Sequence, residues 1–238
     1  MASKLIENTS ERFSVITDLD ISLANAVRRS VGEIDVLAIE EVDIYKNDSS
    51  LYDEIIAHRL GLVPIKNQKL KKDDVLEFKL NVKGKAEGVM VLSGDLSGDI
   101  VYPEIPIVLL SEGQELKIVA KAKSGNGSSH SKYVPGLIFY HHVPKIKISK
   151  DGESQNELAE IYPEAFKLDS SGNLKVQEIV TADLDSDDVE TFPGVEVEST
   201  KNLFFAVESW GQIEAKEIFP EACKALKVNL SEVSKVLK

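Results

Sequence analysis

The sequence predicts an α+β fold in which the two ends of the chain form one discontinuous domain and a mainly β domain is inserted between them. Helical spacing of apolar residues is concentrated near the two ends, whereas the middle favours strands separated by glycine and proline. Helices and strands do not alternate as a regular βαβ repeat, which favours the α+β class. The expected ranges are 1–45 with 199–238 for the domain of the two ends, 46–150 for the inserted β-rich domain, and 151–198 for an acidic segment.

The first 50 residues favour a strand, a helix, a second strand and a turn. Asp18 and Asp20 belong to a helix-start cluster, and Gly32 weakens the end of the helix that follows. The apolar residues of this helix recur at the spacing of one helix face, namely Leu23, Val27, Val31 and Ile34. The expected elements are a strand over 11–17, a helix over 21–33, a strand over 36–45 and a turn over 47–50.

A short helix is predicted directly after this turn, within the stretch 53–65. Asp53 and Glu54 suit the positive N-terminal end of a helix dipole. Gly61 stands where a helix C-terminal stop is expected, and Pro64 follows soon after. Taken alone, these residues are also compatible with an ordinary surface helix that has one apolar side.

The middle of the chain favours strands broken by glycine and proline. A loop is expected over 124–129, where glycine and serine are concentrated, and the core character of a strand returns at 203–207. The expected strands of the middle are 78–82, 88–92, 107–110, 116–120, 137–140 and 146–148.

The last part of the chain predicts a helix with one apolar stripe. Pro220 lies inside this pattern, so the helix either begins near that residue or is kinked there. Cys223 lies on the apolar side and is interpreted as a packed small hydrophobic residue. The stripe consists of Ile218, Ala222, Leu226, Leu230, Val233 and Leu237.

Charge, cysteine count and the length of apolar runs argue against several classes of function. The 238 residues contain 28 Lys and Arg against 40 Asp and Glu, and the resulting net charge of −12 repels a phosphate backbone, so direct nucleic-acid binding is not the expected main role. Cys223 is the single cysteine, which excludes an intrachain disulfide and a cysteine-rich zinc or iron–sulfur site. No apolar run approaches the roughly 20 residues of a membrane span, and the N-terminus lacks a signal-peptide pattern, so we expect a cytoplasmic protein.

Four segments, in order along the chain, resemble one family. They are a helix with Asn and paired Arg over 23–30, the helix and its stop over 53–65, a loop with Gly, His, Lys, Tyr and Pro over 122–135, and a strand followed by a Glu-Ser-Trp-Gly turn over 204–213. This set resembles the assembly subunit of multisubunit RNA polymerases, which comprises the bacterial alpha subunit and its archaeal counterpart, the D subunit. Four ordered matches are far more specific than any one of them.

The resemblance implies a non-catalytic assembly platform of DNA-directed RNA polymerase that supports transcription. Its two ends would form an alpha-like dimerisation domain that pairs with subunit L, and the large B subunit and the small subunits N and P would dock on it. DNA would be reached only through the complex. The residues expected at the dimer interface, some of them packed instead in the chain's own core, are Leu23, Val27, Val31, Leu226, Leu230 and Val233. The residues expected to dock other subunits are Arg28, Arg29, His58, Arg59, His130 and Lys132.

Two departures from the family's range are informative. Bacterial alpha chains continue into a linker and a DNA-binding domain, whereas this sequence stops at Lys238, so the archaeal subunit is expected. Some archaeal members carry a ferredoxin-like insert with clustered cysteines, and residues 161–197 keep a related outline without any cysteine. Because an iron–sulfur cluster requires thiolate ligands, we expect no cluster and no other cofactor. We interpret the acidic run within this region, Asp183 to Glu190, as a solvated loop.

Three other interpretations remain as alternatives. A metal or redox protein could derive from the insert, and a hydrolase could use the histidines. His141 and His142 are adjacent, however, and on a strand they would point to opposite faces, so they cannot easily share a metal. The loop over 124–129 lacks the Gly-Lys-Ser/Thr ending of a phosphate-binding loop. We therefore expect no catalytic or metal-binding residues in this chain.

Overall fold

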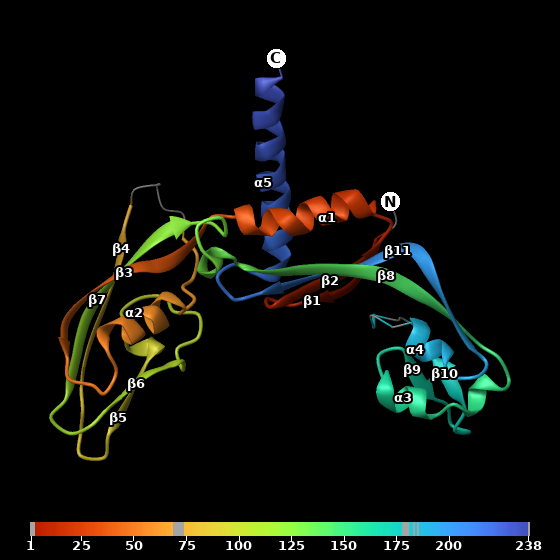
Figure 1. Cartoon of the computed structure of the whole chain (residues 1–238), viewed down its shortest axis with the longest axis horizontal. Coiled ribbons are helices and arrows are strands. Elements are labelled where there is room, and N and C mark those ends of the chain that lie inside the picture. The colour runs from red at the N-terminus through yellow and green to blue at the C-terminus, as the bar shows by residue number, and fades with distance from the viewer. Residues whose placement is uncertain (1–2, 69–73, 178–180, 183, 185, 238) are drawn as a thin grey trace. The chain divides into compact units, whose positions relative to one another are not determined.

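The computed structural model describes residues 3–68, 74–177, 181–182, 184 and 186–237. The chain divides into two compact units, each of them discontinuous in sequence, whose elements are labelled in Figure 1. The first unit contains Met1–Asn8, Phe13–Ala24 and Ile138–Ala206, and the second contains Thr9–Arg12, Asn25–Leu137 and Val207–Lys238. Both units therefore draw on the middle of the chain, and their limits differ from the domain ranges expected from the sequence.

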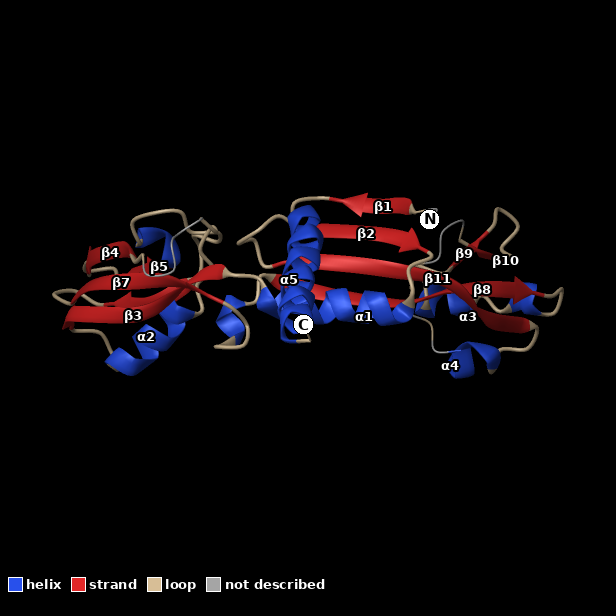
Figure 2. Ribbon diagram, turned by 90° about the horizontal axis from the view of Figure 1, so that it is seen from above, coloured by secondary structure: helices blue, strands red, loops and turns tan. Residues whose placement is uncertain are grey.

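The first unit is built on a four-stranded sheet. Its strands are β1 (Lys4–Asn8), β2 (Arg12–Thr17), β11 (Val195–Ser209) and β8 (Gly136–Ile148), and they lie side by side in that order (Figure 2). Pairs of aromatic side chains pack between β8 and β11. The ring centroids of Phe139 and Phe204 are 6.4 Å apart, and so are those of Tyr140 and Phe205. Because neighbouring residues of a strand point to opposite faces, these two pairs pack on opposite sides of the sheet.

The acidic segment of the first unit is folded, which corrects the solvated-loop interpretation. It forms η4 (Gly152–Ser154), α3 (Glu157–Ile161), the hairpin of β9 (Phe166–Leu168) with β10 (Leu174–Val176), and α4 (Ser186–Glu190). These elements enclose a small core that includes Leu158, Phe166, Leu174 and Val189, each at most 1% exposed.

Helix α4 explains how an acidic run can still fold. Asp187 and Asp188 stand in its first turn, where carboxylates interact favourably with the helix dipole, and Val189 points into the core. In this short helix, the charged side chains stay exposed while the neighbouring valine is buried. Asp183 and Asp185 of the same run lie outside the described residues.

The second unit contains a three-stranded antiparallel sheet with β7 (Glu115–Gly125) in the centre, β3 (Val36–Asn47) on one side and β4 (Leu76–Lys83) on the other. Helix α2 (Asp53–Gly61) contacts β3, and it also contacts β6 (Pro106–Leu110), the partner of β5 (Val89–Leu92) in a separate hairpin. The short helix η2 (Ser93–Asp95) follows β5.

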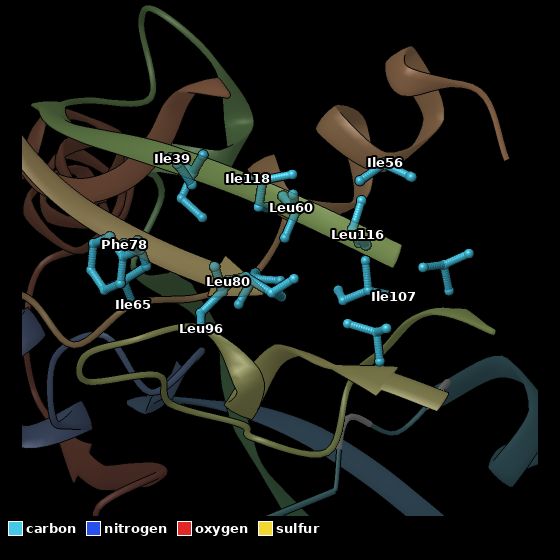
Figure 3. Packing of buried hydrophobic residues seen from close by; sticks show 14 of the residues in the cluster. Ile39, Ile56, Leu60, Ile65, Phe78, Leu80, Leu96, Ile107, Leu116 and Ile118 are labelled. Carbon is cyan, nitrogen blue, oxygen red and sulfur yellow. The ribbon is translucent and has the colours of Figure 1, made fainter. Parts of the chain in front are cut away.

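These elements of the second unit enclose one continuous apolar core. Ile56 and Leu60 come from α2, Ile39 and Ile118 from the sheet, and Ile107 from the hairpin (Figure 3). All five are at most 1% exposed, so the chain's own side chains close this core.

One glycine allows the largest side chain of this core to fit. Gly98 has φ +116°, and a Cβ at this position would lie 2.7 Å from Cε1 of Phe78. Only glycine adopts this backbone conformation easily and leaves room for the ring. Phe78 is consequently 1% exposed and fully enclosed.

The helices at the two ends of the chain differ in detail from the expectation. Helix α1 (Ile21–Arg29) changes to the 3-10 turn η1 (Ser30–Glu33), where Oγ of Ser30 donates a hydrogen bond to the carbonyl of Ala26 at 2.8 Å. Helix α5 (Ala215–Val236) begins before Pro220 and contains it.

The strands in the middle of the chain also differ from the expectation. The two strands expected over 137–148 are the single strand β8, and β7 extends into the expected glycine-rich loop as far as Gly125. Among the described residues, no helix is long and apolar enough to cross a membrane.

Candidate partner-binding surfaces

Helix α5 is buried at its beginning and exposed at its end. Ala215, Ile218 and Ala222 are 0% exposed, and the helix contacts η1 of the same unit. Every described residue from Lys227 onward is exposed. The part of the chain that the structure describes therefore leaves the second half of this helix largely uncovered.

The exposed half of α5 carries a row of apolar side chains, which we call the apolar ridge: Leu226, Leu230, Val233 and Leu237. The intervals of four, three and four residues keep these side chains on one face of the helix. Leu226 is half-buried, whereas Leu230 is 61% and Val233 58% exposed. The same spacing continues backward to Cys223, which the sequence placed on the apolar side, and to Phe219, which it did not single out. Such a row is typical of a helix that pairs with another helix.

Helix α1 contributes less exposed apolar surface than expected. Val27 and Val31 are 3% and 4% exposed, so they pack in the chain's own core, which is the alternative that the sequence left open. The buried stripe runs through Ala24 rather than Leu23, which is 44% exposed. Of the six expected interface residues, the ones that retain accessible surface are Leu23, Leu226, Leu230 and Val233.

The basic residues of α1 and α2 are exposed but differ in what they contact. Nε and Nη2 of Arg28 donate hydrogen bonds to Oδ1 of Asn25 at 3.2 and 3.0 Å, and Arg29 is exposed beside it. In α2, His58 is exposed, whereas Nη1 of Arg59 donates to the carbonyl of Ile107 and so connects the helix to β6. Arg28, Arg29 and His58 are accessible to a partner, while the guanidinium of Arg59 is already used within the chain.

Exposed apolar side chains lie on α2 and at its two ends, near His58 in sequence. Tyr52 is 80%, Ile55 45% and Leu62 54% exposed, at the start, on the outer face and at the end of α2. Tyr52 was not singled out from the sequence, because an isolated aromatic residue in front of a helix carries no periodic signal. This group is a second candidate docking surface.

Lys132 lies in a hydrogen-bonded network within its own unit. Its side chain is 13% exposed, and Nζ lies 2.6 Å from Oε2 of Glu40 and donates to the carbonyl of Ile39 at 2.9 Å. The hydroxyl of Tyr133 donates to the same Oε2 at 2.7 Å. The ammonium group expected to dock another subunit thus holds the turn η3 (Ser131–Tyr133) against β3. His130 is exposed, and its Nδ1 accepts a hydrogen bond from the backbone N–H of Lys132 at 3.1 Å.

The electrostatics of this network agree with a structural role. Hydrogen bonds from Lys132 and then from Tyr133 lower the pKa of the Glu40 carboxyl. Burial, followed by the hydrogen bond to the Glu40 carboxylate, raises the pKa of the Tyr133 hydroxyl. Gly125 faces the ring, since a Cβ there would lie 2.9 Å from it. Glu40 was missed in the sequence because its partners are more than 90 residues away.

The described residues contain no group of three or more His, Cys, Asp or Glu side chains that could hold a metal ion. His141 packs its ring 5.1 Å from that of Phe204, and its Nε2 lies 3.1 Å from the carbonyl oxygen of Thr181. Burial raises the pKa of the Cys223 thiol, which disfavours the reactive thiolate. The exposed apolar side chains of α5 and α2 are of the kind that bind other proteins.

Comparison with known proteins assigns the chain to the class of RNA polymerase subunits that carry an inserted β domain. The RNA polymerase Rpb3/RpoA insert domain family matches residues 39–138, the range that holds the self-contained core of the second unit. This match bears out the resemblance found in the sequence.

Full-length relatives identify the family more closely. DNA-directed RNA polymerase subunit Rpo3 of Pyrococcus furiosus is 36% identical over 234 residues, which cover 89% of this chain and 87% of the relative. The subunit of the same name from Pyrococcus horikoshii is 33% identical over 242 residues, covering 94% and 92%. Subunit rpac1 of DNA-directed RNA polymerases I and III from Dictyostelium discoideum is 29% identical over 276 residues, covering 97% and 80%. The chain belongs to the family of DNA-directed RNA polymerase subunit Rpo3.

Proposed function

We propose that this chain is a non-catalytic assembly platform of a DNA-directed RNA polymerase and supports transcription by binding other subunits. Family membership supports the polymerase assignment, and the apolar ridge is the observation that carries the platform role. A row of leucine and valine exposed to water on the last turns of a helix gains stability only when another molecule covers it.

The partner at the ridge is proposed to be subunit L, a smaller subunit of the same fold, in an alpha-like heterodimer. Covering a leucine or valine side chain completely contributes about 1.5–3 kcal/mol, so Leu230, Val233 and Leu237 together offer a large driving force. Permanent interfaces of this kind are apolar at their centres. Leu23 is the residue of α1 that can extend this interface.

Other subunits are proposed to use the exposed groups elsewhere. Arg28 and Arg29 can bind carboxylates of the large B subunit, because a guanidinium forms paired hydrogen bonds with a carboxylate. The α2 surface of Tyr52, Ile55 and His58 combines apolar area with a titratable group and is offered to the B subunit or to the small subunits N and P.

We further propose that the folded acidic segment holds no iron–sulfur cluster, and that DNA is contacted only through the complex. The support is chemical, since no cysteine lies between residues 151 and 198 and the net charge is −12. A cytoplasmic location stays an expectation from the sequence.

Co-expression with subunit L tests the platform role. Expressed alone, the chain is expected to self-associate through the ridge, and L should convert it to a defined heterodimer, as measured by light scattering after size-exclusion chromatography. A chain that is monomeric alone and remains so in the presence of L would contradict the proposal.

A matched pair of variants places the partner on the ridge. Leu230→Asp puts a charge into the proposed apolar centre and should weaken binding to L by at least about 100-fold. Ser231→Asp introduces the same charge at the neighbouring exposed position, which faces away from the ridge, and should leave the affinity nearly unchanged. Equal losses in both variants would refute the ridge as the binding surface.

A further inference from the structure

A cleft opens beside the other side of α5, entirely within the second unit. Its walls come from η1 and the start of β3, from the loop after α2, from the end of β7, and from the turn that leads into α5. We call it the acidic cleft. The lining residues used below are Glu33, Asp35, Gln212, Glu217, Glu221 and Val228.

The walls of the acidic cleft are held together by one asparagine. Oδ1 of Asn67 accepts a hydrogen bond from the backbone N–H of Leu37 at 3.1 Å, and its backbone N–H donates to the carbonyl of Gln212 at 3.0 Å. The loop after α2 is thereby fixed to both β3 and the turn before α5. The cleft is a built feature of this unit, since residues far apart in sequence are bonded around it.

The charge in the cleft is unbalanced. Glu33, Asp35, Glu217 and Glu221 line it, and Lys224 is the one lysine or arginine among the lining residues that the structure describes. Nζ of Lys224 lies 2.6 Å from Oε1 of Glu221, so one carboxylate is paired within the chain. Glu33 accepts only a weak hydrogen bond, at 3.3 Å, from Oγ of Ser128. The remaining negative potential attracts a cation.

Gln212 provides an independent sign of a missing occupant. This residue lines the cleft and is 8% exposed, and its side-chain Oε1 is buried without a hydrogen-bond partner in the described part of the chain. Leaving a buried acceptor unpaired costs about 1–3 kcal/mol. Because this oxygen has no accessible surface, a donor in the cleft relieves that cost only after the Gln212 side chain turns outward.

Apolar surface next to the carboxylates specifies the occupant further. Ile34, Ile213 and Ala225 line the cleft together with Val228, which is 56% exposed. A bare metal ion gains no stabilisation from contact with apolar surface. The described residues also contain no cluster of three metal-binding side chains. A long side chain with an aliphatic stem and a charged end fits both parts.

We propose that the acidic cleft binds an arginine side chain from a basic segment of another polypeptide. The guanidinium carries five donors in a planar arrangement, enough to bond the carboxylate of Glu217 and to share that of Glu221 with Lys224. A further donor is left for the amide oxygen of Gln212 once that side chain turns outward. The stem packs on Val228 and its apolar neighbours. Nucleic acid is excluded as the occupant by the sign of the charge.

This site is distinct from the apolar ridge. Successive residues of an α-helix are rotated by about 100°, so Glu217, Glu221 and Val228 lie on the side of α5 nearly opposite to Leu226 and Leu230. A helix paired with the ridge and an arginine in the cleft can bind at the same time. The inference therefore does not depend on the identity of the partner at the ridge.

The test uses the full-length chain and a glycine-flanked pentapeptide with a central arginine, titrated at low salt and followed by NMR. The side-chain amide signals of Gln212 are expected to shift on binding. The same peptide with citrulline, which has the same shape without the charge, should bind at least about tenfold more weakly. Equal binding of the two peptides, or shifts confined to residues outside the cleft, would overturn the proposal.

Matched charge variants localise the binding. Glu217→Gln with Glu221→Gln should weaken the arginine peptide about tenfold, whereas Glu157→Gln with Glu160→Gln on α3, an equal change of charge in the other unit, should not. Equal effects of the two pairs would show only general attraction to an acidic protein and would overturn the site. Leu230→Asp should leave peptide binding unchanged, so failure of the ridge and failure of the cleft are distinguished.

A last variant tests whether the chain fills its own cleft. Lys69, Lys71 and Lys72 follow the lining residue Gln68 in sequence and lie outside the described residues. Replacing the three lysines by Gln should leave peptide affinity within about twofold if the site serves another polypeptide. A gain of about tenfold would show that these lysines compete for the cleft, and the partner proposal would fail.

Discussion

Apolar side chains are buried in the core of the second unit but exposed at the end of α5. In the core, a sheet, a helix and a hairpin cover one another until residues such as Leu60 and Ile107 are 0% exposed. On the last turns of α5, side chains of the same kind remain more than half exposed at Leu230 and Val233. The first region secures the fold of this chain, whereas the second is the surface that we propose another chain covers. Stability and assembly thus reside in different parts of the molecule and can be altered separately.

The largest effect on stability is expected in the self-contained core. Phe78→Ala removes a ring that is 1% exposed and leaves a cavity next to Gly98. It should lower the free energy of unfolding by about 3–5 kcal/mol, measured by urea denaturation of the isolated chain. A loss below about 1 kcal/mol would show that this core is not the main source of stability.

A smaller effect is expected in the network that holds η3. Tyr133→Phe removes the hydrogen bond from the Tyr133 hydroxyl to Glu40 and should cost about 1 kcal/mol in the same assay. Tyr52→Phe is the matched control, since Tyr52 is 80% exposed and loss of its hydroxyl should be neutral. If the two variants unfold alike, the Tyr133 contact contributes nothing measurable.

The same network should make stability depend on pH. Folding lowers the pKa of the Glu40 carboxyl, so its contribution is present above the ordinary value of 4.5 and is lost as the pH falls through the lower folded-state pKa. Because Glu40 is partly exposed, the contribution should stay below about 1 kcal/mol. Unfolding at neutral and acid pH should show a smaller acid loss in Glu40→Gln than in the unmodified chain. If the free energy of unfolding depends on pH in the same way in both proteins, Glu40 does not contribute to that dependence.

The smallest effect on stability is expected on the ridge, which completes the contrast. Leu230→Ala removes a side chain that is already 61% exposed, so it should change the free energy of unfolding by less than about 0.5 kcal/mol when the isolated chain is dilute enough to be monomeric. The same substitution should still weaken binding to subunit L, measured by calorimetry. A destabilisation comparable to that of Phe78→Ala would mean that the ridge is covered by this chain itself.

Local patterns predicted the elements and the family but not the burial of individual side chains. The spacing that marks Leu226 and Leu230 also marks Val27 and Val31, yet the first pair ends in a ridge and the second in the core. Periodicity reports which side of a helix is apolar, and it carries no information on what covers that side. Similarly, the acidic residues of α4 led to the prediction of a solvated loop, because the burial of Val189 depends on residues that are distant in sequence.

By itself, the sequence determined the α+β class, the short helix α2, the final helix and the relationship to the polymerase subunits, because spacing, helix-end residues and ordered motifs are local properties. Only the tertiary structure decided that Lys132 is held by Glu40, that the acidic segment folds, and that residues as far apart as Glu33 and Glu221 line one cleft. Such outcomes depend on long-range packing, and the chain specifies them only when its distant segments meet. The physical reason is that burial and hydrogen bonding are properties of a residue's neighbours in space, most of which are not its neighbours in sequence.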